Sequence, residues 1–132
     1  MSWQLQYASE SQTVVITTDS HLSDDEAKDL TRHTIALLRR TRATRILNDL
    51  RALETAPSLA TIYWLVHDFA SLGAVGRARI AVLEPEGPQA HEAAQFYTTV
   101  CANRRYQAEL FTNEEAAQEW LSGASIQTNT QV

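Results

Sequence analysis

Residues 23–50, SDDEAKDLTRHTIALLRRTRATRILNDL, decide the fold of this chain. The step from Ser23 to Glu26 is the spacing of a capping box, in which the side chain of each residue accepts a hydrogen bond from the backbone of the other. A stripe with steps of three and four residues then predicts a helix that buries one face; its members are Ala27, Leu30, Thr34, Leu37 and Leu38. Residues 45–50 follow almost without a linker and are rich in branched side chains, which predicts a buried parallel strand.

The pattern of helices and strands continues on both sides of this segment. Before it, residues 3–7 and 14–16 predict two strands joined by a hairpin-like turn. After it, we expect a helix that Pro57 and Ser58 open and Gly73 caps at its end, followed by a strand at 79–83. A helix with apolar spacing from Ala90 to Cys101 and a strand at 106–111 come next. The last expected element is a short helix capped by Thr112, which packs back onto the domain through Ala116, Trp120 and Leu121. The expected fold class is α/β, with a single mixed sheet of about five strands and four flanking helices.

The length of the chain bounds its domain organisation. At 132 residues it suits one domain and is too short for two. We expect residues 1–122 to form that domain. Residues 123–132 are mostly polar and hold only Ile126 as a large apolar residue before the last one, so we expect a flexible C-terminal tail there.

Charge and cysteine content narrow the classes of partner and the compartment. Sixteen acidic and eleven basic residues give a formal charge of −5 and a pI near 5.3, which disfavours nucleic acid as a partner. A cluster of four arginines ends an acidic-led helix, where the helix dipole favours cations; the four are Arg39, Arg40, Arg42 and Arg45. One cysteine cannot form an internal disulfide, and no apolar stretch reaches the length of a membrane span, so we expect a cytoplasmic location.

Three stretches carry a resemblance to a known family. They are LSDDE at residues 22–26, ILNDLR at residues 46–51 and AELFTNEEAAQEWL at residues 108–121. In these stretches, and in the order of elements over residues 3–122, the sequence resembles the SpoIIAA-like family of the STAS superfamily. The resemblance implies a mixed sheet flanked by helices, no cofactor, and a regulatory or ligand-binding role.

The resemblance also singles out Ser58. The best known STAS proteins are antagonists of anti-sigma factors that are switched by phosphorylation of a serine at the start of the helix after the central strand, and Ser58 occupies that position. A phosphate there would meet free backbone amides and the positive end of the helix dipole. The Asp-Ser-Ser-Gly type of motif is replaced here by APSL at residues 56–59. A plain helix cap is the other interpretation of Ser58.

Asp49 and Arg51 lie where the central strand ends. Crevices at the carboxyl ends of parallel strands are the usual ligand sites of open α/β sheets, and Glu84 and Glu86 follow the next strand toward the same rim. An ion pair between Asp49 and Arg51 that fixes the loop is the structural alternative to a binding role.

The second helix offers another candidate surface. Trp64 and His67 fall on the face opposite its apolar stripe, together with Ala60 and Ser71. An exposed tryptophan beside a histidine indicates a contact surface, either for a second copy of the chain or for another protein. Packing of Trp64 beneath a loop or a neighbouring helix is the alternative.

No catalytic or metal-binding motif is complete in the sequence. His91 begins a stretch like the HExxH zinc signature, but Gln95 stands in place of the second histidine. Cys101 falls on an apolar helix face, where burial makes a thiol unreactive. We therefore expect a non-catalytic, STAS-like regulatory or protein-interaction module without metal or cofactor. The alternative is a module that binds a small apolar ligand or lipid in a pocket between helix and sheet.

Overall fold

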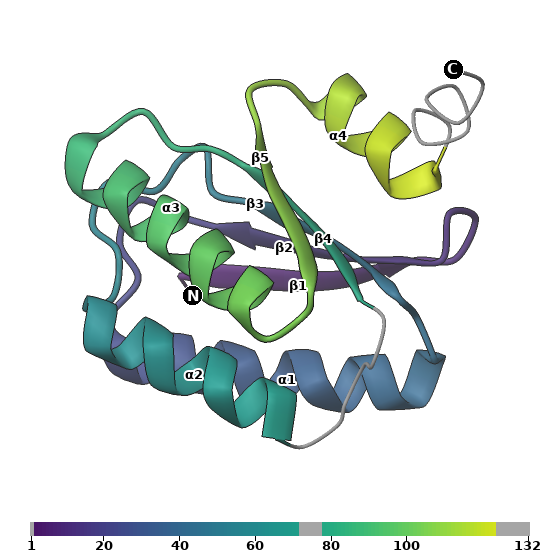
Figure 1. Ribbon diagram of the computed structural model, residues 1–132, viewed down its shortest axis with the longest axis horizontal. Coiled ribbons are helices and arrows are strands. Elements are labelled where there is room, and N and C mark those ends of the chain that lie inside the picture. The colour runs from purple at the N-terminus through teal and green to yellow at the C-terminus, as the bar shows by residue number, and fades with distance from the viewer. Residues whose placement is uncertain (1, 72–77, 124–132) are drawn as a thin grey trace.

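The computed structural model describes residues 2–71 and 78–123, which form one five-stranded mixed sheet flanked by four helices (Figure 1). The elements are β1 (Trp3–Ala8), β2 (Thr13–Thr18), α1 (Asp24–Thr41), β3 (Arg45–Asp49), α2 (Leu59–Ser71), β4 (Arg79–Leu83), α3 (Pro88–Asn103), β5 (Gln107–Phe111) and α4 (Glu114–Ser122). The strands lie in sequence order across the sheet, with β1 antiparallel to β2 and the other pairs parallel. The expected fold class is confirmed.

The two faces of the sheet are covered unequally. Helices α1, α2 and α3 pack on one face, and α4 lies alone on the other (Figure 1). The larger core lies under the three helices and includes Val14, Leu38 and Ile80. The smaller core joins Leu47 and other strand residues to the inner side of α4. Because side chains alternate between the faces of a strand, β3 and β4 contribute to both cores.

The register of the parallel strands gives the sheet two different ends. At the N-terminal edge, the first residues of the parallel strands are neighbours; these are Thr13, Arg45, Arg79 and Gln107. At the C-terminal edge the neighbours are Thr17, Asp49, Leu83 and Phe111. Each parallel strand ends at the C-terminal edge, and the next one starts at the N-terminal edge. Helices α1, α2 and α3 each carry the chain back between these edges.

The start of α1 agrees with the sequence. Oγ of Ser23 accepts a hydrogen bond from the amide of Glu26 at 3.1 Å, and Oε1 of Glu26 accepts one from the amide of Ser23 at 2.8 Å, which completes the predicted capping box. Gly73 and residues 124–132 lie outside the described residues, so the helix cap at Gly73 and the flexible tail remain predictions. No described helix is both long enough and apolar enough to cross a membrane.

The start of α4 differs from the sequence-based expectation. The prediction that Thr112 caps this helix is wrong, because Asn113 is the cap and its Oδ1 accepts a hydrogen bond from the amide of Ala116 at 2.8 Å. Strand β5 pairs with β4 as far as Phe111, so Thr112 belongs to the turn and the helix begins one residue later. For the same reason Ala117 is the buried alanine of α4 where we expected Ala116.

Candidate functional site

The C-terminal edge of the sheet holds an ion pair between Asp49 and Arg51. Nε and Nη2 of Arg51 donate to Oδ1 and Oδ2 of Asp49 at 3.0 and 2.8 Å, and the amide of Arg51 donates to Oδ1 at 3.1 Å. Nη2 also lies 3.4 Å from Oε1 of Glu114, so Arg51 connects the end of β3 to the start of α4. The hydrogen bonds from Arg51 lower the pKa of Asp49 against the opposing effect of burial. Both carboxylate oxygens of Asp49 are engaged within the protein, which favours the structural interpretation of this pair.

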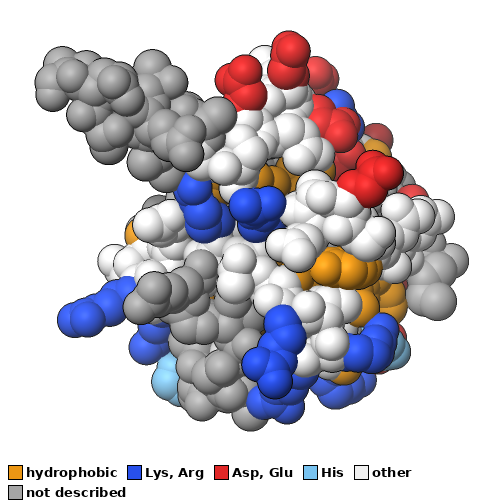
Figure 2. Space-filling view, turned by 90° about the vertical axis from the view of Figure 1, so that its right-hand side faces the viewer, with side chains coloured by type: hydrophobic (Ala, Val, Ile, Leu, Met, Phe, Trp, Pro, Cys, Tyr) orange, Lys and Arg blue, Asp and Glu red, His pale blue; other side chains and the backbone are white. Residues whose placement is uncertain are grey.

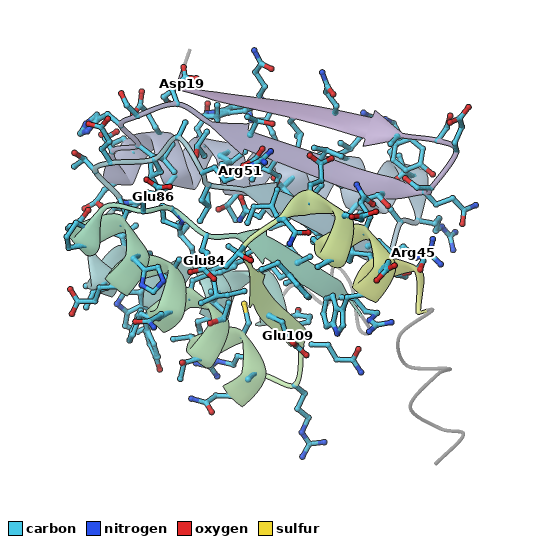
Figure 3. All side chains as sticks on the ribbon, turned by 90° about the horizontal axis from the view of Figure 1, so that it is seen from above. Asp19, Arg45, Arg51, Glu84, Glu86 and Glu109 are labelled. Atoms are coloured by element: carbon cyan, nitrogen blue, oxygen red, sulfur yellow. The ribbon has the colours of Figure 1, made fainter. Side chains whose placement is uncertain are left out.

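Glu84 and Glu86 follow β4 and lie at the C-terminal edge (Figure 3). Oε1 of Glu84 is 2.9 Å from Nε2 of His91, near the start of α3. Within residues 2–71 and 78–123, no group of three or more His, Cys, Asp or Glu side chains could hold a metal ion. At the C-terminal edge, Asp49, Glu84 and Glu114 are therefore held in local pairs.

Ser58 directly precedes α2, and its Oγ accepts a hydrogen bond from the amide of Thr61 at 3.2 Å, as a helix cap does. Asp24, at the start of α1, accepts two bonds from Ser58, one from its amide at 2.9 Å and one from its hydroxyl at 3.3 Å. The amide bond is the largest cause that lowers the pKa of Asp24. A phosphate on Ser58 would replace the hydroxyl donor by negative charge beside this carboxylate. The arrangement favours a cap over a phosphorylation switch.

The outer face of α2 carries large hydrophobic side chains. Trp64 is 58% exposed, Tyr63 and Leu59 are each 39% exposed, and no other large hydrophobic side chain of the described residues is exposed. The ring of His67 meets that of Trp64 edge-on at a centroid distance of 5.6 Å and stacks with that of Tyr63 at 6.5 Å. We call Leu59, Tyr63, Trp64 and His67 the α2 aromatic surface.

Tyr63 is a member of this surface that sequence reasoning missed. Helical spacing places it at the border between the two faces of α2, so periodicity does not decide its exposure. Its hydroxyl accepts a hydrogen bond from Nη2 of Arg104 at 3.2 Å, and the guanidinium carbon of Arg104 lies 5.6 Å from the ring centroid. The surface thus reaches the end of α3. Nδ1 of His67 is buried and has no hydrogen-bond partner in the described part of the chain.

A cavity of about 130 Å³ lies between the three helices and the sheet. Most of its wall is apolar, with Leu30 of α1, Val66 of α2 and Ala93 of α3 among the lining residues. Oδ1 of Asn48, also in the wall, is buried and makes no hydrogen bond within the described residues, although Tyr97 is close. Asn48 is a candidate that sequence reasoning missed. Strand alternation nevertheless places it on the same sheet face as the core residues Ile46 and Leu50, two positions before and after it.

Cys101 lines the same cavity and is a free, buried cysteine. Burial raises the pKa of its thiol to about 12. The thiol is therefore protonated at neutral pH and a poor nucleophile, as we expected for a core residue.

Comparison with known proteins is informative at the level of structure. No family model and no curated protein matches the sequence. SpoIIAA, an anti-sigma factor antagonist, in its unphosphorylated form aligns with a TM-score of 0.56 and 18% identity, over 98% of this chain and 99% of that one. The phosphorylated form of SpoIIAA, a Bacillus cell fate determinant, aligns with a TM-score of 0.55 and 19% identity, over 89% of this chain and 98% of that one. An uncharacterised DUF3478 family protein with a SpoIIAA-like fold, from Shewanella loihica PV-4, aligns with a TM-score of 0.57 and 13% identity, over 90% of this chain and 91% of that one.

The chain has a SpoIIAA-like fold of the STAS type. In this SpoIIAA-like fold the candidate residues fall into separate places. Asp49 and Arg51 meet at the C-terminal edge, Trp64 and His67 meet on the outer face of α2, and Ser58 caps the start of that helix. The SpoIIAA-like domain therefore presents a helix surface and a cavity, and Asp49 and Arg51 form an ion pair at the C-terminal edge.

Proposed function

We propose that this chain is a regulatory module that acts by binding another protein through the α2 aromatic surface. The exposure of Trp64 carries the proposal, because this side chain remains 58% exposed on a helix whose opposite face packs in the core. Tryptophan and tyrosine are enriched among the residues that supply most of the binding energy of protein interfaces. Contiguous apolar groups on a surface mark sites that a partner covers.

Two further observations support this role. SpoIIAA, which shares the fold, is an anti-sigma factor antagonist. Two side chains of catalytic type have structural surroundings, since Asp49 is held by Arg51 and the Cys101 thiol is buried and protonated. We place this module in the cytoplasm, where a free cysteine is stable.

Photo-crosslinking tests the surface directly. A photoreactive phenylalanine analogue is placed at Trp64 in one variant and at the exposed Lys28 of α1 in a control variant, and both are irradiated in cells of the source organism. The proposal expects a defined adduct from position 64 that position 28 does not give. The captured protein, once purified, should bind the wild type and lose at least tenfold in affinity with Trp64→Ala, because a central aromatic anchor contributes about 2 kcal/mol or more.

The outcomes separate the versions of this proposal. If the captured protein binds Trp64→Ala and the wild type equally, the α2 aromatic surface is not its binding site. Light scattering of the wild type and of Trp64→Glu addresses self-association: a dimer that becomes a monomer in Trp64→Glu identifies a second copy as the partner. A monomer in both samples excludes the second copy.

The cavity supports a second candidate function, the binding of a small apolar ligand. Its volume of about 130 Å³ is close to that of an engineered apolar cavity of about 150 Å³ that binds benzene, so one aromatic ring suits it better than a long acyl chain. The unpartnered Oδ1 of Asn48 can accept one hydrogen bond from such a ligand. We infer that a ring bearing a hydroxyl group suits the cavity.

Thermal unfolding with benzene and with phenol tests this candidate. A ligand that binds only the folded state raises the unfolding temperature, so both compounds should raise it and phenol should raise it more. Ala93→Leu fills the cavity and should abolish both shifts, whereas Ala36→Leu, on an exposed position of α1, should leave them unchanged. Asn48→Ala should remove the preference for phenol. Equal shifts in Ala93→Leu and in the wild type would place the binding elsewhere.

A further inference from the structure

Arginines gather at the N-terminal edge of the sheet. Seven of the chain's eleven lysine and arginine residues lie near the ends of α1 and α3 or at the first residues of β3 and β4. They are Arg39, Arg40, Arg42, Arg45, Arg79, Arg104 and Arg105. Figure 2 looks onto this edge, with basic side chains across its centre and lower part and acidic side chains gathered above them. The fold therefore concentrates positive charge at one end of a chain whose net charge is −5.

Three of these arginines have no side-chain partner in the described part of the chain. Arg40, Arg42 and Arg105 are exposed, and their side chains make no ion pair or hydrogen bond within the described residues. The carboxylates on the elements that meet at this edge include Glu10 in the turn between β1 and β2, Asp68 in the last turn of α2 and Glu109 in β5. These arginines are thus available to an anionic partner.

Arg79 shows that the edge is electrostatically unbalanced. Its Nε and Nη2 are buried and have no hydrogen-bond partner in the described part of the chain, and its guanidinium carbon lies 4.3 Å from the centroid of the Trp120 ring. Burial lowers the pKa of Arg79, Glu109 partly opposes that effect, and the charge of nearby Arg45 lowers it further. A negative charge bound at this edge would stabilise both arginines.

Two of the arginines occupy backbone positions that favour glycine. Arg42 follows α1 with a φ of 63°, and Arg105 lies beyond the end of α3 with a φ of 70°. A side chain in this left-handed region costs free energy that glycine avoids, because its Cβ crowds the backbone. Strain of this kind persists where the residue has another use. The two side chains are exposed at the same edge, where they can contact a bound anion.

We propose that the N-terminal edge binds a carboxylate-rich segment of the same partner protein that covers the α2 aromatic surface. Arg104 joins the two regions, since it belongs to the edge and contacts Tyr63. The guanidinium group of arginine can form two parallel hydrogen bonds with one carboxylate, and attraction between opposite charges speeds the association of the two proteins. A net charge of −5 opposes a long polyanion such as nucleic acid more than a short acidic segment. This inference rests on the proposed function and adds the chemistry of the partner.

Fluorescence anisotropy with a labelled twelve-residue peptide of alternating Glu and Gly tests the edge. The test variant combines Arg42→Gly with Arg105→Gly. The matched control combines Lys28→Gln with Arg32→Gln, which removes the same charge from exposed positions of α1 away from the edge. The test variant should bind the peptide about fivefold more weakly than the wild type, and the control should stay within about twofold. Added salt should weaken binding to the wild type.

Each outcome bears on one part of the inference. Equal losses in the test variant and the control would overturn the edge as a site, as would an absence of peptide binding at low salt. Tighter binding of a twelve-nucleotide single-stranded DNA, or of vesicles containing phosphatidylserine, would overturn the choice of an acidic protein. Trp64→Ala separates the two proposals, because a peptide of Glu and Gly offers no apolar group to the α2 aromatic surface. A loss in the arginine variant with unchanged binding in Trp64→Ala supports the edge, and a loss only in Trp64→Ala refutes it. The α2 aromatic surface fails separately, if the captured protein binds Trp64→Ala and the wild type equally. If the wild type forms a dimer and the arginine variant is a monomer, the assignment of the edge to a separate partner protein is overturned.

Discussion

The two edges of the sheet use charge differently. At the C-terminal edge, Asp49 and Arg51 neutralise one another, and Glu84 lies against His91. At the N-terminal edge, Arg42 and Arg105 are exposed without an ion pair within the described residues and sit in strained backbone conformations. Paired charges contribute to the stability of the fold, and unpaired charges of one sign contribute to encounter with another molecule. The edge at which parallel sheets usually bind ligands is, in this chain, the one where the described charges are paired.

Charge reversal at the C-terminal edge should have the largest effect on stability. Arg51→Glu would place a third carboxylate beside Asp49 and Glu114, and it should lower the free energy of unfolding by about 2 kcal/mol. Arg40→Glu makes the same change at the N-terminal edge and should shift it by less than about 0.5 kcal/mol. Urea denaturation of both variants measures the difference. Equal losses would show that the two edges are not distinct.

Acid titration of stability sharpens the comparison. The pKa of Asp49 is lowered in the folded protein, so the ionised pair stabilises the fold above the ordinary carboxyl pKa near 4 and loses that effect as pH falls through the lowered value. Asp49→Asn should therefore be less stable than the wild type by about 1 kcal/mol at pH 7, and the difference should vanish near pH 2. Denaturant unfolding at a series of pH values measures it. A difference that persists at pH 2 would assign the loss to packing.

Relief of strain at the N-terminal edge should have the smallest effect, with the opposite sign. Arg42→Gly should raise the free energy of unfolding by about 0.5 kcal/mol, since glycine accepts the left-handed φ of 63° at the end of α1. Arg40→Gly, two residues earlier and within the last turn of α1, should lower it by about 1 kcal/mol. Thermal and urea unfolding of the two variants provide the test. A loss in both would mean that Arg42 contributes to folding.

The sequence predicts the fold well because local signals agree with the tertiary structure. The capping box at Ser23 and the stripe that follows specify α1, and the lack of a linker before Arg45 specifies a parallel strand. The start of α4 shows the limit of such signals. Thr112 and Asn113 are both good caps, and only the pairing of Phe111 in the sheet decides between them.

The sequence predicts the candidate surfaces less completely. Trp64 was found because helical spacing separates it from the apolar stripe of α2, whereas Tyr63 becomes part of the surface through a contact with Arg104. The arginines between residues 39 and 45 have a local explanation in the helix dipole. Arg79 and Arg105 join them only through the parallel register, which no local pattern encodes.

The cavity has a mechanical consequence for the domain. When a folded protein with unfilled internal volume unfolds, that volume is eliminated and the total volume of protein and water falls. Hydrostatic pressure therefore favours unfolding. With about 130 Å³ between its helices and its sheet, this domain should yield to compression more readily than a close-packed domain of equal length. Any molecule that fills the space would make it harder to compress.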